Sequence, residues 1–452
     1  MTQENGHSRR SVLPWWNNNG HHENGNGNDS GLRLLGRGPN TGRRYAHITG
    51  WGMAVPDRVL TNHDLEAIVE TNDQWIRTRT GIAERRIADE NESTGHLALR
   101  AAQAAIKVAD ILPTDIDLVI VATSTPEHIF PSTASLLQDW LGAKYAGAFD
   151  LSAACSGFVY AMDMAAAKIR LGDIDTALVI GAETMSRVMN WSDRGTCILF
   201  GDGAGAVILT GSNQPGGVLS SVLRSDGSGW DMLGLPTVGS RDTYLQPKEE
   251  IDWDNYDDNH PPRFMHRLHM NGREVFRFAT RVINESIKDA LKMADLEIED
   301  IGLVIPHQAN QRIIESAARG LKLPTEKFYS NVARYGNTSA ASIPIALCEA
   351  IDEGKVNAGD NLVFCGFGGG LAWATMVVQW VNVPIKRQPM TGIRRQVTYA
   401  YALQRRKIVR SWRRLSSRLA GSPTPDATMR QLRQQLAQKN EPTEEEKVPE
   451  KS

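Results

Sequence analysis

KVADILPTDIDLVI, residues 107–120, returns 185 positions further along the chain as KMADLEIEDIGLVI, residues 292–305. Eight of the fourteen positions are identical, and both copies have the pattern of a helix, a turn and a buried strand. The same offset pairs TALVIG, which ends at Gly181, with NLVFCG, which ends at Gly366. An apolar run stopped by glycine is therefore repeated as well, and the sequence predicts a duplicated α/β unit.

The composition limits the classes of function open to the chain. Its 452 residues are 41% hydrophobic, enough for large buried cores. The 50 Lys and Arg residues nearly balance the 52 Asp and Glu residues, so a net charge of −2 gives no overall attraction to nucleic acid. No apolar run approaches the roughly 18 residues of a membrane-spanning helix, and the polar N-terminus lacks the apolar core of an export signal.

The cysteines are widely spaced and include no CxxC pair. They are Cys155, Cys197, Cys348 and Cys365. This spacing argues against a zinc site and against a disulfide framework. We therefore expect no bound metal and a reducing, cytoplasmic location.

Both ends of the chain differ in composition from its middle. Residues 1–44 are rich in Asn and Gly, which predicts a disordered extension. Residues 385–421 are strongly basic with apolar residues at helical spacing, which predicts a basic amphipathic helix that either docks on its own domain or binds an anionic partner such as a membrane surface. The apolar residues of that helix are Ile408, Trp412, Leu415 and Leu419. Residues 422–452 have the composition of a solvated tail.

DLSAACSGF, residues 150–158, puts a thiol among small residues. Cys155 falls opposite Ala340 in the repeat, so one half alone has a thiol at this turn, which indicates one active site where the halves meet. The helical spacing after it places Cys155 near a helix N-terminus, which we expect to lower the thiol pKa. The alternative is a small core residue, because free cysteine often merely packs.

The second copy supplies polar partners for this thiol. His307 directly follows an apolar strand in LVIPHQANQRII, and Asn337 follows a Tyr-Gly turn in ARYGNTSAASIP. A thiol, an imidazole and a carboxamide on small-residue turns suit acyl transfer at a thioester, with the cysteine carrying the acyl group. The glycines of FCGFGGGLAW, residues 364–373, let backbone N–H groups approach a ligand and complete an oxyanion hole.

Six motifs now identify a family resemblance that runs from residue 45 to residue 381. They are TNDQWIRTRTGI, DLSAACSGFVYAM, FGDGAGA, IPHQANQRII, YGNTSAASIP and FGGGLAW. Together they resemble β-ketoacyl-acyl carrier protein synthase III, a member of the thiolase superfamily that starts fatty-acid chains. The resemblance implies a homodimer of duplicated thiolase-like α/β folds in five layers, α-β-α-β-α. Its halves would be residues 45–222 and 273–384, joined by a segment at 223–272.

The resemblance also implies the chemistry. Cys155 would take an acyl group from acyl-CoA, and malonyl-acyl carrier protein would then bind and lose CO₂. His307 and Asn337 would stabilise the resulting enolate thioester, which attacks the acyl-cysteine and releases a 3-oxoacyl product. The N–H groups of Cys155 and Gly369 would form the oxyanion hole. No cofactor is implied beyond these two substrates.

Further roles follow from the resemblance, residue by residue. The coenzyme A contacts would be Trp75, Arg79 and Arg194. The acyl pocket would contain Phe200, Met270 and Phe367, with Phe130 reaching across the dimer. Ala309 and Asn310 would also bind substrate, and Arg312 would meet the acidic carrier protein. Each arginine has a plainer alternative, a surface salt bridge.

The chain departs from the family pattern in its connecting segment. It carries a long insertion with an acidic run at residues 252–258, either a lid or a dimer-edge loop, which leaves the acyl-chain preference open. An elongating synthase would carry a second histidine where Asn337 stands. A same-fold synthase of a secondary-metabolite or polyketide pathway, with a different acyl donor, keeps the same triad and stays open. A cysteine peptidase would have no reason for the duplication, and a non-catalytic scaffold would be expected to have lost a triad member.

Overall fold

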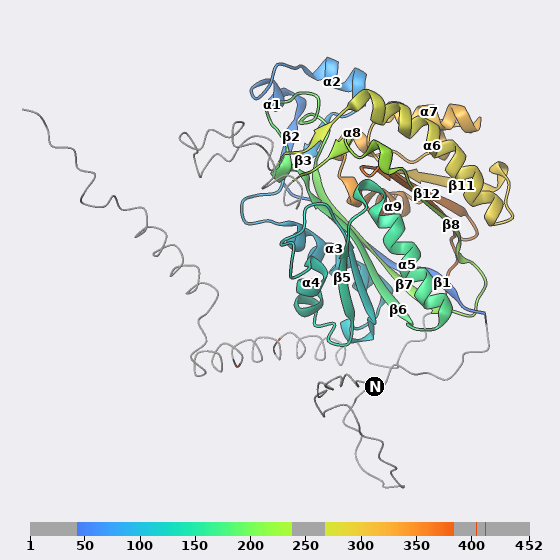
Figure 1. Ribbon diagram of the computed structural model, residues 1–452. Helices are drawn as coiled ribbons and strands as arrows, with labels where there is room; N and C mark the ends of the chain where they lie inside the picture. Colours follow the sequence, from blue (N-terminus) through green and yellow to red (C-terminus); the bar gives the residue numbers. More distant parts are fainter. Residues whose placement is uncertain (1–42, 237–266, 384–403, 405–411, 413–452) are drawn as a thin grey trace, which may run out of the picture. The chain divides into compact units, whose positions relative to one another are not determined.

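The computed structural model describes residues 43–236 and 267–383, together with the single residues 404 and 412 (Figure 1). Within this part of the chain, the larger strands form one sheet of five and one of four. The first has the order β1 (Tyr45–Ala54), β7 (Asp202–Ser212), β6 (Thr176–Thr184), β4 (Leu118–Ala122) and β5 (Gly147–Leu151). The second has the order β11 (Ile301–Pro306), β12 (Asn361–Gly368), β13 (Ala372–Gln379) and β8 (Gly217–Ser225).

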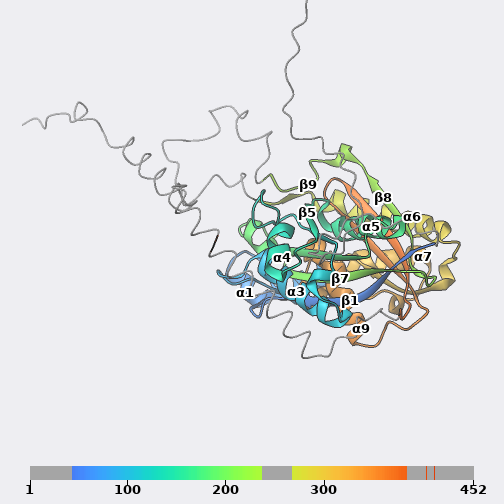
Figure 2. The same ribbon diagram turned by 90° about the horizontal axis from the view of Figure 1, so that it is seen from below.

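Three layers of helices alternate with the two sheets. Helices α3 (Thr94–Ala109) and α4 (Thr133–Leu141) cover the outer face of the first sheet, and α6 (Gly272–Met293) and α7 (Gln311–Leu321) cover that of the second. Helices α5 (Gly157–Leu171) and α9 (Ser342–Asp352) lie between the sheets, in a core that contains apolar residues of both. Figure 2 shows α3 and α4 separated from α6 and α7 by the strands. The predicted duplicated five-layer α/β fold is confirmed.

The duplication extends to single backbone angles. Asp110 and Asp295, which lie just after the repeated helices, have φ values of 56° and 57°. Ala154 and Ser339, also 185 positions apart, have φ values of 45° and 50°. Each opens a 3₁₀ turn, η2 (Ala154–Ser156) or η9 (Ser339–Ala341), that leads directly into a central helix. The two halves therefore carry the same strained turn.

The apolar spacing and the terminal glycine of α5 explain why a helix follows Cys155 and where it ends. Helix α5 buries Phe158, Met162 and Ile169 completely, the face that the sequence spacing predicts. It ends at Gly172, whose φ of 83° suits a residue without a side chain. The strand β4 is buried on both faces and is parallel to β5 and β6, as is typical of a central strand of an α/β sheet.

The second sheet and its boundary differ in detail from the sequence expectation. Strand β8 (Gly217–Ser225) begins within the range predicted for the first half and crosses its boundary at residue 222, yet it pairs with β13 of the second sheet. The position that corresponds to β5 is reduced, in the described part of the chain, to one bridge between Val304 and Phe328. The domain boundaries themselves stay predictions.

The remaining short elements lie at the edges of this framework. They are β2 (Val59–Thr61), α1 (Asn62–Glu66), α2 (Asp73–Thr80), β3 (Glu84–Arg86), β9 (Leu233–Gly234), β10 (His269–Met270) and α8 (Val332–Tyr335). No helix of the described residues is both long and apolar enough to pass through a membrane.

Several sequence predictions fall outside the described residues. These are nearly all of the N-terminal extension 1–44, residues 237–266 of the connecting segment with their acidic run, most of the basic helix 385–421, and the tail 422–452.

Candidate active site

Cys155 lies in the turn that joins β5 to α5. Its side chain is 6% exposed, and two glycines of β12 form the adjacent wall. A Cβ atom on Gly368 would lie 3.3 Å from the Cys155 Sγ and 2.9 Å from its backbone N, and one on Gly366 would lie 2.9 Å from the Cα of Ser156. The glycine-rich sequence is therefore needed because the strand passes directly against the thiol.

The pKa of this thiol is raised, to about 12, so the expectation of a lowered pKa is wrong. Burial is the main cause, because the charged thiolate loses its hydration, and the nearby Glu183 carboxylate adds to the shift. The side-chain hydrogen bond with Ser339 acts in the opposite direction.

Glu183 and Ser339 are functional candidates that the sequence reasoning missed. Glu183, in β6, is completely buried and accepts a hydrogen bond from the Ser339 Oγ at 2.9 Å, while the Cys155 Sγ lies 3.5 Å from the same Oγ. The repeat offset contained the signal: it sets Ser339 opposite Ala154 in the turn of the thiol, and Glu183 opposite Gly368.

His307 begins the loop after β11, as its place behind an apolar run predicts. Its backbone N–H donates to the carbonyl of Cys365 at 2.8 Å, and its ring meets Phe367 edge-to-face with the centroids 5.1 Å apart. Burial lowers the pKa of His307 to about 3, so the imidazole is neutral at ordinary pH. Its Nδ1 has no hydrogen-bond partner among the described residues.

Asn337 is fixed by its neighbours on both sides. Its backbone N–H donates to Leu199 at 2.8 Å, and its carbonyl accepts from Gly201 at 3.0 Å. The Asn337 Oδ1 accepts from the backbone N–H of Ser339 at 2.8 Å. Because Ser339 also contacts the thiol, Asn337 and Cys155 are linked through one residue.

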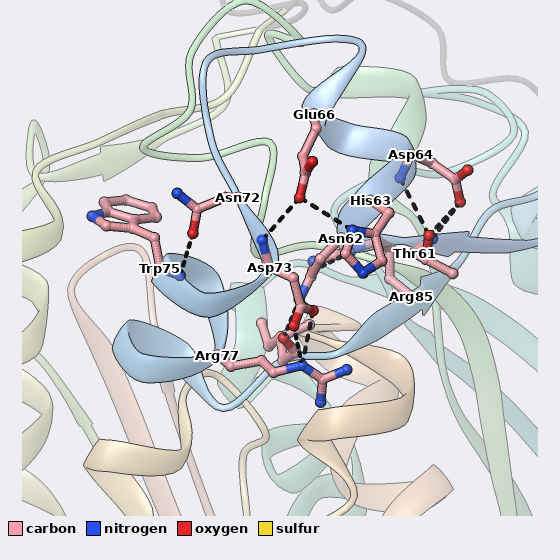
Figure 3. A network of polar contacts seen from close by, with 11 residues as sticks. Thr61, Asn62, His63, Asp64, Glu66, Asn72, Asp73, Trp75, Arg77 and Arg85 are labelled. Atoms are coloured by element: carbon pink, nitrogen blue, oxygen red, sulfur yellow. Dashed lines mark hydrogen bonds and ion pairs between the residues drawn. The ribbon is translucent and has the colours of Figure 1, made fainter.

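The predicted coenzyme A residues also come together. Trp75 lies beside the guanidinium groups of Arg79 and Arg194, whose Cζ atoms are 5.6 and 5.1 Å from the centroid of its ring. Figure 3 shows how α2 is held: the Asn72 side chain accepts from the Trp75 N–H at 2.8 Å, and Arg77 pairs with Asp73. An aromatic ring beside two cations is suited to stack a base and bind phosphate.

Helix α7 connects this cluster to the second half. Asn310 caps the helix, and its Nδ2 donates to the carbonyl of Arg79 at 3.1 Å. Arg312 is exposed, with its guanidinium 5.5 Å from the Phe276 ring. Ala309 packs against the core beneath α6 and α7.

The residues predicted for the acyl pocket divide into separate places. Phe200 and Met270 share one apolar cluster with Met185, Met189 and Leu268. Phe367 lies instead in the core of the second half, against His307. Phe130 is 85% exposed, next to the exposed Ile129.

A buried arginine supports the same region. Arg85 is completely buried; its Nη2 donates to the carbonyl of Ile198 at 2.6 Å and its Nη1 to the Asn62 Oδ1 at 2.9 Å. Burial lowers its pKa to about 10, which leaves it charged at neutral pH. Arg85 therefore connects β3 to the segment around Ile198 and Leu199, which in turn hydrogen-bonds to the backbone of Asn337.

The described residues contain no group of three or more His, Cys, Asp or Glu side chains arranged to hold a metal ion. All four cysteines lie within the described ranges and are free thiols.

Comparisons with known proteins agree with this arrangement. Residues 149–227 match the family model "3-Oxoacyl-[acyl-carrier-protein (ACP)] synthase III", and residues 291–380 match its C-terminal model. The chain is 51% identical over 337 residues to the beta-ketoacyl-[acyl-carrier-protein] synthase III of Symbiobacterium thermophilum, covering 75% of this chain and 98% of the relative.

Solved structures give the same result. The 3-oxoacyl-[acyl-carrier-protein] synthase III of Aquifex aeolicus is 45% identical, with a TM-score of 0.66 over 74% of this chain and 100% of that one. The priming beta-ketosynthase of the R1128 polyketide pathway is 33% identical, with a TM-score of 0.69 over 78% of this chain and 100% of that one. The chain therefore belongs to the β-ketoacyl-acyl carrier protein synthase III family, acyltransferases with a thiolase-like fold.

Proposed function

We propose that this chain joins an acyl group from acyl-CoA to malonyl-acyl carrier protein, with loss of CO₂, and so starts fatty-acid chains. The observation that carries the proposal is the Cys155 thiol in the turn before α5, walled by Gly366 and Gly368. The sulfur attacks the acyl-CoA carbonyl, and the acyl group is held on Cys155 as coenzyme A leaves.

His307 and Asn337 then serve the decarboxylation. A neutral imidazole donates a hydrogen bond without bringing a charge, which suits a developing enolate oxygen. The Asn337 oxygen is already used by the N–H of Ser339, so its NH₂ group is the donor left for a ligand. The backbone N–H groups of Cys155 and Gly369 form the oxyanion hole for the acyl carbonyl.

The substrates approach over α2 and α7. Trp75 stacks the adenine of coenzyme A while Arg79 and Arg194 meet its phosphates, and the hydrogen bond from Asn310 to Arg79 fixes the two helices beside one another. The exposed Arg312 on α7 meets the acidic surface of the carrier protein. Ala309 and Asn310 line the path of the bound substrate.

The acyl chain binds in the apolar cluster of Phe200 and Met270. A Cβ on Gly369 would lie 2.8 Å from the carbonyl oxygen of Leu233, which packs on this cluster, so the glycine loop and the cluster adjoin. Phe367 shapes the site from the other side, through its contact with His307.

We also infer a homodimer. Among the described strands, β5 stands at the edge of its sheet, and the exposed Ile129 and Phe130 lie on the loop between β4 and α4. An unpaired strand edge beside exposed apolar side chains is typical of a surface that a second copy covers. Phe130 would then reach the partner's acyl pocket.

A polyketide or secondary-metabolite synthase is the second candidate, because the R1128 priming ketosynthase is 33% identical. The higher identities, 45% and 51%, are to proteins named for the acyl-carrier-protein synthase III reaction, which favours the fatty-acid assignment. A cytoplasmic location, the lack of a cofactor and an anionic partner for residues 385–421 stay predictions.

The test is intact-protein mass spectrometry after incubation with a panel of acyl-CoAs. Wild type should gain the mass of one acyl group, and Cys155→Ala should gain none. Cys348→Ala is the matched control, because Cys348 is buried in α9 and should leave labelling unchanged. Wild type that stays unlabelled, or Cys155→Ala that is labelled, would contradict the proposal.

A further inference from the structure

The raised pKa of Cys155 leaves its proton without an evident acceptor. Because burial raises the pKa of Cys155, the thiol keeps its proton at neutral pH. His307 is a poor base for this proton, because burial lowers its pKa to about 3. A second buried group must therefore be considered.

The structure offers a continuous chain of hydrogen bonds away from the sulfur. The Cys155 Sγ lies 3.5 Å from the Ser339 Oγ, and the Ser339 Oγ lies 2.9 Å from the Glu183 Oε1. A hydroxyl has one donor and two acceptor sites, so Ser339 can accept from the thiol while it donates to the carboxylate. This geometry is that of a two-step proton relay.

The surroundings of Glu183 suit an acceptor that is sealed from water. The carboxylate receives hydrogen bonds from the Thr125 hydroxyl at 2.6 Å, the Thr123 hydroxyl at 3.3 Å and the Ser124 N–H at 3.0 Å. These donors are neutral, and burial raises the pKa of Glu183. No cation pairs with Glu183 among the residues that the structure describes, and a buried carboxylate surrounded by neutral donors gains from taking up a proton.

The elements packed around this chain of hydrogen bonds present few titratable side chains among the described residues. Cys155 comes from η2, Glu183 from β6 and Ser339 from η9. The segment after β4 presents hydroxyls and an N–H, and β12 presents Gly366 and Gly368. The pair that exchanges the proton is thus the thiol and the carboxylate.

The duplication gives independent support. Glu183 corresponds to Gly368, and Cys155 corresponds to Ala340. In the half with the thiol, Gly368 has no side chain to cover the backbone N–H of Cys155. In the other half, the Glu183 carboxylate occupies the equivalent position and accepts a hydrogen bond from the backbone N–H of Ala340. An acid therefore sits where the equivalent turn would receive a substrate oxygen.

We propose that Ser339 and Glu183 are a proton relay that takes the Cys155 proton during acylation and holds it on Glu183 until the acyl group leaves. The proposal rests on the proposed role of Cys155 as nucleophile. The thiol proton passes to the Ser339 oxygen while the Ser339 proton passes to the Glu183 Oε1. Sulfur then forms its bond to the acyl carbon, the bond to coenzyme A breaks, and coenzyme A leaves as a thiolate that solvent protonates.

Condensation returns the proton. The enolate formed by loss of CO₂ attacks the acyl carbon, the acyl bond to Cys155 breaks, and the sulfur leaves as a thiolate. The relay then runs in reverse, so Cys155 regains its proton and Glu183 its charge. Over the whole cycle, solvent supplies one proton, which ends on coenzyme A.

The first test is the rate of Cys155 alkylation by iodoacetamide between pH 6 and pH 10, in full-length wild type and in Glu183→Gln. The relay predicts that the variant reacts about 100-fold more slowly at pH 7, because the amide cannot accept the proton. If Glu183 acted through its charge alone, its removal would lower the thiol pKa and the variant would react faster. A faster or unchanged rate would overturn the proposal.

Two further measurements separate this result from misfolding. Ser339→Ala should slow alkylation in the same way, while Ser342→Ala, which removes another buried serine hydroxyl of the same segment, should not. In wild type, infrared difference spectra should gain the carbonyl band of a protonated carboxylic acid on acylation by acyl-CoA. Acylated wild type without that band overturns the relay alone, whereas a failure of Cys155 to acylate overturns the proposed function.

Discussion

Gly368→Ala tests the geometry that encloses the nucleophile. The new Cβ would lie 2.9 Å from the Cys155 N, 3.1 Å from its Cβ and 3.3 Å from its Sγ. Carbon contacts need about 3.5–4.0 Å, so β12 and the Cys155 turn must separate by about 0.5 Å. Both are backbone segments packed between sheets, and neither can move away as a flexible side chain would.

The size of the effect follows from this clash. Overpacking of a tight core costs about 1–3 kcal/mol of unfolding free energy. A misplacement of about 1 Å costs about 100-fold in rate, so a shift of half that size predicts about a tenfold slower acylation. The rate is measured by intact-protein mass spectrometry with acyl-CoA, and the unfolding free energy by urea titration.

Gly227→Ala is the matched control, because a Cβ there would meet no atom within 4 Å. It should leave both quantities unchanged. A Gly368→Ala protein that acylates at the wild-type rate would refute the claim that this glycine forms the wall of the thiol site.

Three more predictions concern the supports of the site. Trp75→Ala should raise the KM for acyl-CoA about tenfold and leave the alkylation rate of Cys155 unchanged, because stacking is lost while the thiol is untouched; steady-state kinetics check this. Arg85→Gln should lower the unfolding free energy by about 3 kcal/mol, because buried carbonyls lose a charged donor, and urea titration would contradict this if the midpoint stayed in place. The pKa of His307 is lower in the folded protein than in the unfolded chain, so the unfolding free energy that depends on neutral His307 is fully present above about pH 6.5 and is lost as the pH falls toward 3. At pH 4.5 the unfolding free energy of wild type, measured by urea titration, should have fallen by about 3 kcal/mol more than that of His307→Asn.

The sequence predicted the framework well because that framework repeats. The pairing of residues 107–120 with residues 292–305 predicted the duplicated sheets and the helices that precede them. Apolar spacing predicted the buried face of α5, and glycine content predicted a close approach near Cys155. These features depend on local pattern, which a single sequence displays.

Features that depend on long-range packing could not be predicted in this way. The pairing of β8 with β13 joins strands about 155 residues apart, and no local pattern specifies that partner. The pKa of Cys155 was misjudged because local sequence shows the helix N-terminus but not the depth of burial. Phe367 was grouped with Phe200 by resemblance, whereas alternation along β12 turns its side chain to the opposite face from Gly366 and Gly368.

The contrast between the two halves explains why one fold duplication yields one active site. Both turns have a similar positive φ, 45° at Ala154 and 50° at Ser339, and both lead into a central helix. At the first turn the next residue is a thiol facing glycine; at the second it is Ala340 facing Glu183. The second turn cannot receive an acyl group because a carboxylate already occupies that place. Since Ser339 also touches the Cys155 sulfur, the half without a thiol places its acid within proton-transfer reach of the half that has one.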